Sequence, residues 1–402
     1  MYTESFFDIL LNLREGWVVE SVRTDIVQDE IHINIKCISN KIEYDDKEGL
    51  CEVYDFAPLR SWRHLDALQY KTYISCRLPR IKTSNGSVKT IQPEWASNHD
   101  RHTFFFESAI INLLKATRNQ TKTAELMRCG FNVVNRIIHR SVERGMKRRD
   151  HKTLTFENLS VDEKSFKKGH KYITVLSDPD SGFILDVEGD RTKESFKKLM
   201  DKTLTPTQQQ GVKTVSMDMW KAFMNTAKEI LPQASIVHDC FYLVKYLNDA
   251  IDKVRQREVK NNEVLINSRY ALLKNPENLT EKQQLKFEAI RNANFEVSEA
   301  WQVRENFKDL FSSNKQNGTS LFAHWVMDAV NQNVKEVTKV VKMFTNHISG
   351  VVNALIMNQS NAMAERLNGK IQELKTIGRG YRTFNNFRSA ILFFNGGLDL
   401  YH

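Results

Sequence analysis

The sequence predicts a multidomain α/β protein in which an all-α segment interrupts a central mixed sheet. Residues 154–241 alternate between apolar, β-branched runs and runs of helical period, as in a sheet with helices packed on it. Residues 242–356 have almost only helical periodicity. Residues 17–95 contain stretches that alternate with period two, which is typical of half-buried strands. These observations predict a small β module, a sheet core and a helical insertion.

Composition limits the classes of protein that fit. The chain has 402 residues, of which 41% are hydrophobic, and its formal net charge is +9. This length suits about two to four domains, and the basic balance favours a polyanionic partner. The five cysteines are scattered and form no CxxC pair, which favours a reducing compartment. No apolar stretch is long enough for a membrane helix, and no basic signal-peptide start precedes the first apolar residues. We therefore expect a cytoplasmic protein with no membrane partner.

Residues 1–98 are predicted to form the small β module. The first 16 residues have the spacing of a short amphipathic helix. The stretch EIHINIKCI, which begins at Glu30, alternates strictly between apolar and polar side chains. Two further strand-like stretches, residues 66–81 and 87–95, are joined at a Ser-Asn-Gly turn.

Residues 99–153 are predicted to form a helix-turn-helix. FFFESAIINLLKATR, from Phe104, reads as one helix, and two more helices are broken at Cys129 and Gly130. The last helix would begin near Asn132 and expose side chains suited to DNA bases and backbone: Asn132, Asn135, Arg136, His139, Arg140 and Arg144. The basic residues after them suit phosphates: Lys147, Arg148 and Arg149. The alternative is an ordinary helical hairpin with a basic, solvated side.

Residues 154–241 and 357–402 are predicted to form the sheet core around the insertion 242–356. Three consecutive strands are expected at 159–166, 172–178 and 182–190. A helix, a strand, a helix and a strand are expected to follow at 193–204, 212–219, 220–231 and 234–239. Three antiparallel strands followed by this alternation is the order of a ribonuclease-H-like mixed sheet.

Two carboxylates lie on predicted strands, and a third lies on a predicted helix. The strand acids are Asp162 and Asp218, and the helix acid is Glu365. The first and fourth strands of such a sheet are neighbours, so the two strand acids can lie side by side. Carboxylate oxygens bind hard divalent cations, and a pair of such cations can stabilise the charge of phosphoryl transfer. Taken singly, each acid could instead have an ordinary structural role, because an Asp after a strand is often a turn residue and a Glu on a helix is usually solvated.

Glu163 competes with Asp162 for the site. Strand alternation puts the two on opposite faces, so only one of them is expected to face the site, and the pattern does not decide which. On the third segment, polar residues recur at helical spacing and form one face that can reach a metal or a DNA backbone: Asn361, Glu365, Asn368 and Gln372.

Four strings in this order, VDEKSFKKGHKYITVLSD, VSMDMWKAF, LLKNPENLT and SNAMAERLNGKIQELK, resemble the ISL-three family of bacterial insertion-sequence transposases. The resemblance runs from about Arg60 to the C-terminus. It implies a DDE enzyme with a ribonuclease-H-like core and a helical insertion before the last acid. It also implies that Asp162, Asp218 and Glu365 are the catalytic, metal-binding acids, which decides against Glu163. The cofactor it implies is two Mg²⁺ or Mn²⁺ ions.

One position departs from the family pattern. After the fifth strand the family usually reads Asp-x-Phe-His, whereas this chain has Asp239, Cys240, Phe241 and Tyr242. Asp239 and Tyr242 are therefore expected to support the active site from beside it. Tyrosine can donate a hydrogen bond but is uncharged at neutral pH. The neighbouring His238 could compensate, or it could be an ordinary strand-end histidine.

The N-terminal module stands where many members of the family carry a small zinc-binding domain. Its cysteines are isolated rather than paired, so zinc is not expected and the module would be a degenerate zinc ribbon that binds DNA or dimerises. Trp62 in this module is assigned to the core. Trp301 in the insertion could be a DNA-facing wedge, but a core position is favoured.

The resemblance implies a transposase that binds terminal inverted repeats, hydrolyses one strand at each transposon end and joins the freed 3′-OH to target DNA. Double-stranded DNA would be the partner, a homodimer on DNA the working form, and the nucleoid the location. On the Glu365 helix, the residues expected at the DNA are Asn361, Arg366, Asn368 and Lys370. The alternatives are a catalytically inactive DNA-binding relative and a structure-selective, metal-dependent nuclease.

Overall fold

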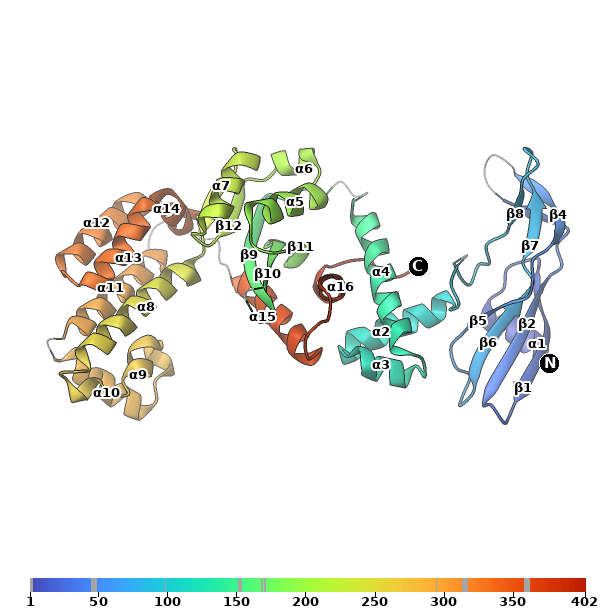
Figure 1. Ribbon diagram of the computed structural model, residues 1–402, viewed down its shortest axis with the longest axis horizontal. Helices are drawn as coiled ribbons and strands as arrows, with labels where there is room; N and C mark the ends of the chain where they lie inside the picture. The colour runs from blue at the N-terminus through green and yellow to red at the C-terminus, as the bar shows by residue number, and fades with distance from the viewer. Residues whose placement is uncertain are drawn as a thin grey trace. The chain divides into compact units, whose positions relative to one another are not determined.

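The computed structural model describes residues 3–44, 49–97, 99–150, 154–167, 169, 171–293, 295–312, 317–357 and 362–402. The chain divides into two compact units, Met1–Met146 with Asp399–His402, and Lys147–Leu398. Helices and strands are distributed over both units, so the chain is a multidomain α/β protein, as predicted (Figure 1).

The N-terminal part of the first unit consists of a short helix, α1 (Thr3–Leu11), and two four-stranded sheets. The first sheet has the order β1 (Trp17–Asp25), β2 (Glu30–Cys37), β6 (Lys71–Cys76) and β5 (Arg60–Arg63). The second has the order β3 (Lys41–Glu43), β4 (Leu50–Phe56), β7 (Pro79–Lys82) and β8 (Val88–Thr90). The predicted alternation of β2 is confirmed, because its apolar side chains are buried and the others more exposed.

Tryptophan and cysteine side chains fill the core of this β module. Trp62 is fully buried and meets Trp95 edge to face at 5.8 Å, so its assignment to the core is confirmed. Cys37 and Cys76 are buried on neighbouring strands. Burial raises the pKa of the Cys76 thiol to about 12, so this thiol is a small apolar core group at neutral pH.

Three helices complete the first unit: α2 (Phe104–Thr117), α3 (Gln120–Leu126) and α4 (Phe131–Asp150), which continues into the second unit. The predicted break near Gly130 is confirmed, since α3 ends and α4 begins on either side of it. The last residues of the chain, which the sequence places with the sheet core, instead contact these helices. The Tyr401 hydroxyl donates to Asn112 Oδ1 (2.7 Å), and the Arg144 guanidinium donates to the Leu400 carbonyl (2.7 Å).

The second unit is built on a five-stranded sheet of order β11-β10-β9-β12-β13. Its strands are β9 (Asn158–Lys167), β10 (Lys171–Asp178), β11 (Phe183–Gly189), β12 (Thr214–Met217) and β13 (Ser235–His238). The first three are antiparallel, and β12 runs parallel to both β9 and β13. The predicted order of elements and the predicted pairing of the first and fourth strands are both observed.

Helices pack on both faces of this sheet (Figure 1). Leu159, Val161 and Leu185 pack in one cluster with residues of α5 (Lys193–Thr203) and α7 (Lys221–Ile230). A short helix, α6 (Pro206–Gln210), joins α5 to β12. Side chains alternate along a strand, so Asp162 and Asp186 point to the other face. There they meet α15 (Ala362–Ile377) and α16 (Phe384–Asn395).

The rest of the second unit is helical over the described residues between β13 and α15, as predicted. Its helices are α8 (Cys240–Glu258), η1 (Glu263–Leu265), α9 (Arg269–Leu273), η2 (Pro276–Asn278), α10 (Glu281–Arg291), α11 (Glu296–Ser312), α12 (Gly318–Asn331), α13 (Lys335–Asn346) and α14 (Ile348–Met357). Trp325, Phe307 and Phe344 are buried in its core, and Trp301 packs on that core against Phe287 (4.9 Å). Trp301 is therefore a half-buried residue at the margin of the core. In the described part of the chain no single helix is long and apolar enough to span a membrane; α13 and α14 meet the criterion only together, across an 84° bend.

Candidate active site

Two carboxylates meet at one edge of the five-stranded sheet. Asp162 lies in β9, and Asp218 directly follows β12. Because β9 and β12 pair in parallel up to Ser160 and Ser216, both acids lie just beyond the last paired residues. The pKa of Asp218 is raised, first by burial and also by the negative charge of Asp162, so the two carboxylates interact. The predicted pairing of these acids is thus present in the structure.

Both acids line a cavity of about 250 Å³. The wall opposite the strands is α8, through residues spaced by three and four positions: Tyr242, Lys245, Tyr246 and Asp249. The remaining lining residues are Val161, Glu163, Trp220 and Phe223.

Each carboxylate accepts a hydrogen bond from one tyrosine of α8. The Tyr242 hydroxyl donates to Asp162 Oδ1 at 3.4 Å. The Tyr246 hydroxyl donates to Asp218 Oδ1 at 3.3 Å, with Oδ2 at 3.5 Å. Burial, reinforced by the nearby carboxylates, raises the pKa of both phenols, that of Tyr246 to about 12. The two hydroxyls are therefore protonated at neutral pH and act as donors to the carboxylates.

Sequence reasoning identified Tyr242 but missed Tyr246. The signal was available, because Tyr246 follows Tyr242 by one helical turn on the segment that begins after Asp239. It was missed because that segment was assigned entirely to the helical insertion. The first helix of the insertion is in fact a wall of the site.

The expectation that only one of Asp162 and Glu163 faces the site is wrong, since both line the cavity. The two side chains do leave opposite faces of β9. However, β12 stops pairing with β9 at Ser160, so the strand has an open edge there and both faces border the cavity. Glu163 is held by Arg191, whose Nη1 donates to Glu163 Oε1 at 2.9 Å. Asp162, by contrast, interacts with the charge of Asp218 and accepts a hydrogen bond from Tyr242 of α8.

The third predicted acid does not join this pair. Asn368 of α15 donates its side-chain amide to Asp162 Oδ2. Glu365 lies one turn earlier on α15, is exposed, and contributes with burial and Asp239 to raising the pKa of Cys240 to about 12. Over the described residues, no group of three or more His, Cys, Asp or Glu side chains has the arrangement of a metal site. The structure therefore brings together two of the three predicted acids, with Asn368 as the contact from α15.

The other residues predicted on this helix differ in exposure. Arg366 is exposed and donates to Met363 Sδ (3.0 Å), and Lys370 is half-buried. Asn361, also predicted at the DNA, lies outside the described residues.

The Asp162 and Asp218 pair fits a divalent cation. Two mutually repelling carboxylates offer hard oxygen ligands, which is the donor set that Mg²⁺ and Mn²⁺ prefer. A cation between them would offset the charge that raises the pKa of Asp218. The geometry supports one such position and leaves the protein ligands of a second ion unassigned.

Asp239 and His238 are not among the residues that line the cavity. Asp239 is buried and caps α8, accepting a hydrogen bond from the Phe241 amide (2.9 Å). His238 is 3% exposed, has Nδ1 3.3 Å from the Met217 carbonyl, and packs against His347 of the helical region. Burial lowers the pKa of His238 to about 4, so it is neutral. It is an ordinary strand-end histidine, and of the two residues considered at this position only Tyr242 lines the cavity.

The residues predicted to read DNA from α4 are only partly exposed. Asn132 and Arg136 are exposed, whereas Asn135 and His139 are half-buried. Arg140 forms an ion pair with the buried Asp100.

The expected exposure of Arg144 is wrong, because its side chain is only 18% exposed. Arg144 forms an ion pair with the buried carboxylate of Glu107 and donates a hydrogen bond to the Leu400 carbonyl, and these contacts hold its side chain away from solvent. Of the basic residues that follow, Lys147 is exposed and Arg148 half-buried, while Arg149 donates to the Leu185 carbonyl at 2.6 Å.

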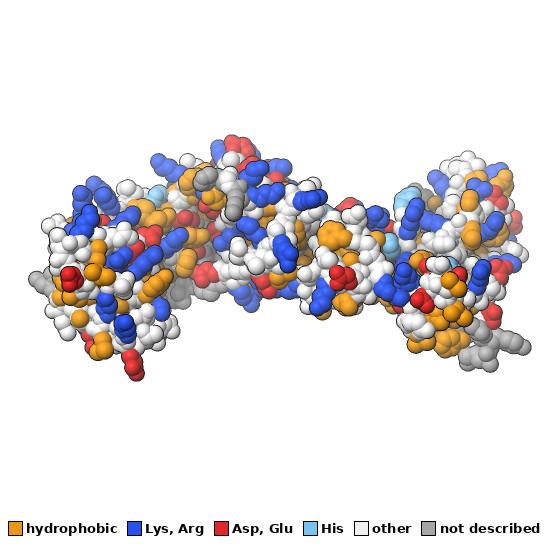
Figure 2. Space-filling view, turned by 60° about the horizontal axis from the view of Figure 1, so that its bottom comes forward, with side chains coloured by type: hydrophobic (Ala, Val, Ile, Leu, Met, Phe, Trp, Pro, Cys, Tyr) orange, Lys and Arg blue, Asp and Glu red, His pale blue; other side chains and the backbone are white. Residues whose placement is uncertain are grey.

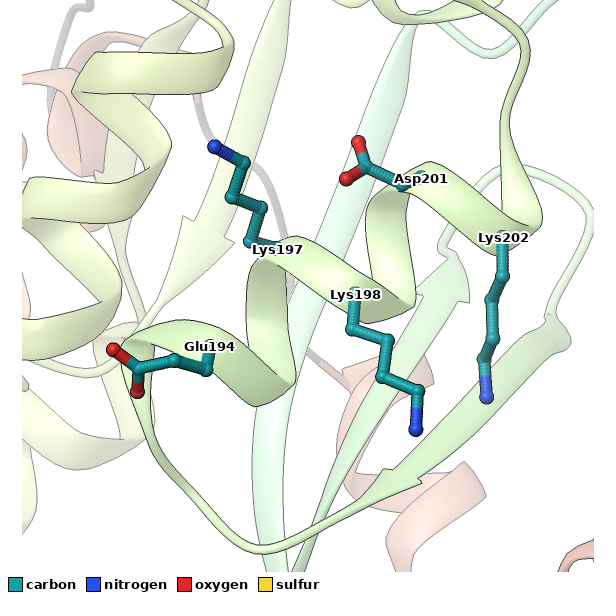
Figure 3. A pocket seen from close by; sticks show the side chains of 5 residues that line it. All are labelled: Glu194, Lys197, Lys198, Asp201 and Lys202. Atoms are coloured by element: carbon teal, nitrogen blue, oxygen red, sulfur yellow. The ribbon is translucent and has the colours of Figure 1, made fainter.

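A second hollow, of about 550 Å³, lies on the outer side of α5, where three lysines and two acids line it (Figure 3). Lys198 and Lys202 point the same way and pair with Glu188 at 3.2 and 2.7 Å. Lys197 points elsewhere and lies 4.0 Å from Glu229. On the face seen in Figure 2, lysine and arginine side chains are spread among acidic ones and do not gather into one patch. The carboxylate cavity is therefore the stronger candidate.

Comparison with known proteins defines the class. Residues 159–391 match the profile of the ISL-three DDE family, described as transposase. This match covers more than half of the chain, and all three predicted acids fall within it.

Curated relatives agree with this assignment. The chain is 25% identical over 355 residues to the transposase for insertion sequence element IS1557 of Mycobacterium tuberculosis, covering 81% of this chain and 79% of that protein. It is 23% identical over 342 residues to the transposase for insertion sequence element IS1001 of Bordetella parapertussis, covering 83% of each. The chain belongs to the ISL-three family of insertion-sequence transposases.

Proposed function

We propose that this chain is a catalytically active transposase that binds the terminal inverted repeats of its element, hydrolyses one strand at each end and joins the freed 3′-OH to target DNA. The observation that carries the proposal is the pair of carboxylates, Asp162 and Asp218, at one cavity on neighbouring parallel strands. Because its substrate would be chromosomal DNA, it would act in the cytoplasm at the nucleoid.

The proposed catalytic domain is a ribonuclease-H-like core, residues 154–241 and 357–398, with residues 242–356 as its insertion; the last four residues, predicted as part of this core, belong to the first unit. The strand order, with three antiparallel strands followed by two parallel ones, supports this assignment. In that fold the acids at the end of the first and fourth strands are where metal-dependent phosphodiester chemistry takes place.

In the proposed mechanism Asp162 and Asp218 would hold a divalent cation, Mg²⁺ or Mn²⁺. Glu365, which does not line the cavity in this structure, would have to approach the pair to complete a two-ion site. When bound, the ions supply activation of the attacking oxygen and stabilisation of the charge on the phosphate. The chain's own residues keep the carboxylates in position for this. Tyr242 and Asn368 each donate to one oxygen of Asp162, and Tyr246 donates to Asp218.

We propose that α3 and α4 form a helix-turn-helix that recognises the inverted repeats. The exposed Asn132 and Arg136 are the side chains best placed to read base edges, with Asn135 beside them. Lys147 and Arg148 would contact phosphates, as would Arg366 and Lys370 of α15. Arg140, Arg144 and Arg149 make internal contacts and would contribute through these instead. The β module, residues 1–98, would add DNA contacts or dimer contacts, and a homodimer would pair the two ends.

The test is cleavage of a labelled inverted-repeat end by purified protein with Mg²⁺ or Mn²⁺. Asp162→Asn and Asp218→Asn should each lower the cleavage rate by at least about a hundredfold, because either change removes a charged metal ligand. Asp328→Asn is the matched control, since Asp328 is exposed on α12, away from the cavity. Cleavage that is the same in wild type and Asp218→Asn would refute the catalytic proposal.

An inactive DNA-binding relative is the second candidate, and its specific basis is Tyr242, an uncharged residue that contacts Asp162 where the resemblance implies a histidine. The structure-selective nuclease is a third candidate. A DNA-binding protein without cleavage activity would shift labelled ends in a gel and leave them intact with either metal. A plain nuclease would cut the ends and yield no products joined to target DNA. Joined products that require Asp218 would support the transposase over both.

A further inference from the structure

Lys245 stands on the wall of the carboxylate cavity, between the two tyrosines that contact the acids. It follows Tyr242 by three residues and precedes Tyr246 by one, and all three line the cavity from α8. The Lys245 ammonium lies 5.4 Å from the centre of the Tyr242 ring, whose hydroxyl donates to Asp162. The ammonium therefore borders the same opening as the carboxylate pair.

The charge of Lys245 is not used in an ion pair with any residue that the structure describes. Acidic partners are close by, because four acidic residues line the same cavity. One of them, Glu163, pairs with Arg191 rather than with Lys245. Lys245 is exposed, and its positive charge lowers the pKa of Asp218, so its field reaches the acids. An accessible cation at a cavity of acids is placed for a ligand that carries negative charge.

A DNA phosphate fits this position in charge and in size. The cavity of about 250 Å³ is several times the roughly 30 Å³ that a water molecule takes, so it admits a phosphodiester group. The carboxylates alone would repel the phosphate, and cations held by them would attract it. A lysine ammonium is a compact point charge that binds phosphate oxygens through short, charge-assisted hydrogen bonds.

We propose that Lys245 binds a nonbridging oxygen of one phosphate in the DNA strand that is cleaved at the Asp162 and Asp218 pair. This inference rests on the function proposed above and adds a substrate-binding residue to it. It gives the first helix of the insertion a direct role in holding the substrate.

The first test compares Lys245→Ala with Lys253→Ala in single-turnover cleavage of a labelled inverted-repeat end. Lys253 is the matched control, because it is exposed on the same helix and does not line the cavity. We expect Lys245→Ala to lower the rate by at least about tenfold, Lys245→Arg to retain most of it, and Lys253→Ala to match wild type. Thermal melting of each variant checks that it is folded.

The second test locates the phosphate. Single methylphosphonates, which remove the charge of one phosphate, are placed in turn around the cleavage position, and equilibrium binding is measured at several salt concentrations with Ca²⁺ present, so that a divalent cation can occupy the carboxylates. At one position the substitution should weaken binding of wild type by at least about fivefold and leave binding of Lys245→Ala unchanged. The dependence of log K on log salt should be shallower for Lys245→Ala by about one unit.

The outcomes separate this inference from the function on which it rests. If wild type cleaves and Lys245→Ala equals Lys253→Ala in rate and salt slope, the inference is overturned and the transposase proposal stands. If wild type cleaves no inverted-repeat end, the functional proposal fails. The binding scan still decides about Lys245 in that case, since equal sensitivity of wild type and Lys245→Ala at every phosphate overturns its role.

Discussion

The ion pair between Asp186 and Arg388 ties α16 to β11 and yields a prediction about stability. Asp186 is 1% exposed, and its two oxygens accept hydrogen bonds from Arg388 Nε and Nη2 at 2.7 Å each. Lys202 adds a third contact at 3.4 Å. The change Arg388→Met removes the guanidinium and keeps an unbranched side chain of similar reach.

The magnitude follows from what Asp186 loses. Removing one partner of a buried ion pair typically costs about 3–5 kcal/mol, because a charge remains buried without compensation. Arg388 is 29% exposed and Lys202 remains, so we expect the lower end, about 3 kcal/mol. Replacing both partners with apolar residues, Asp186→Leu with Arg388→Met, removes the stranded charge and should recover at least half of that loss.

The assay is urea denaturation combined with hydrogen–deuterium exchange of peptides from β11 and α16. Exchange is needed because a chain of two compact units does not have to unfold in one step. Lys193→Met is the control, since it breaks an exposed ion pair with Glu229 and should leave the denaturation midpoint within error. The reasoning is refuted if Arg388→Met costs no more than this control, or if exchange in α16 does not accelerate.

Three further outcomes are expected. Gly350→Ala should cost about 1–3 kcal/mol in denaturation, because a Cβ there would overlap the buried His238 ring; an unchanged midpoint would mean that the ring has room to move. The pKa of His238 is about 4 in the folded protein and about 6.5 when exposed, so the unfolded state binds the proton more tightly. The contribution of His238 to the free energy of unfolding is therefore full above about pH 6.5 and falls by as much as about 3 kcal/mol as the pH drops toward 4. The change His238→Asn should flatten this part of the curve of stability against pH. Tyr246→Phe should slow cleavage roughly fivefold, the equivalent of about 1 kcal/mol for one long hydrogen bond to Asp218, and an equal rate would show that the hydroxyl does not position this acid.

The arrangement of the second unit could be predicted from the sequence because its signals are local. The changes of period marked the strands and helices, and the apolar runs before Asp162 and Asp218 placed both acids on strands that then paired in parallel. Asp162 could be chosen over Glu163 only by resemblance to a family. The structure explains why strand alternation could not decide between the two acids, since the open edge of β9 lets both side chains border the cavity.

Contacts between residues far apart in sequence could not be predicted in the same way. Arg144 has the position of a DNA-reading residue on α4, yet it binds the Leu400 carbonyl, 256 residues away. Asn368 was predicted at the DNA, and the structure shows that it donates to Asp162, 206 residues away. Periodicity gives the face of a helix on which a side chain lies, but not the element that covers that face.

The helical region between β13 and α15 contributes to the candidate active site as well as connecting its parts. One face of α8 carries Tyr242 and Tyr246, which donate to the two strand acids. The apolar face of the same helix, with Leu243 and Leu247, is buried in the core of the insertion, in a cluster that also includes Val237 of β13. A displacement of the insertion against the sheet would therefore lengthen hydrogen bonds to the carboxylates that are already 3.3–3.4 Å long. This couples the packing of the helical region to the geometry of the carboxylate pair, so that core substitutions such as Leu247→Ala should affect cleavage as well as stability.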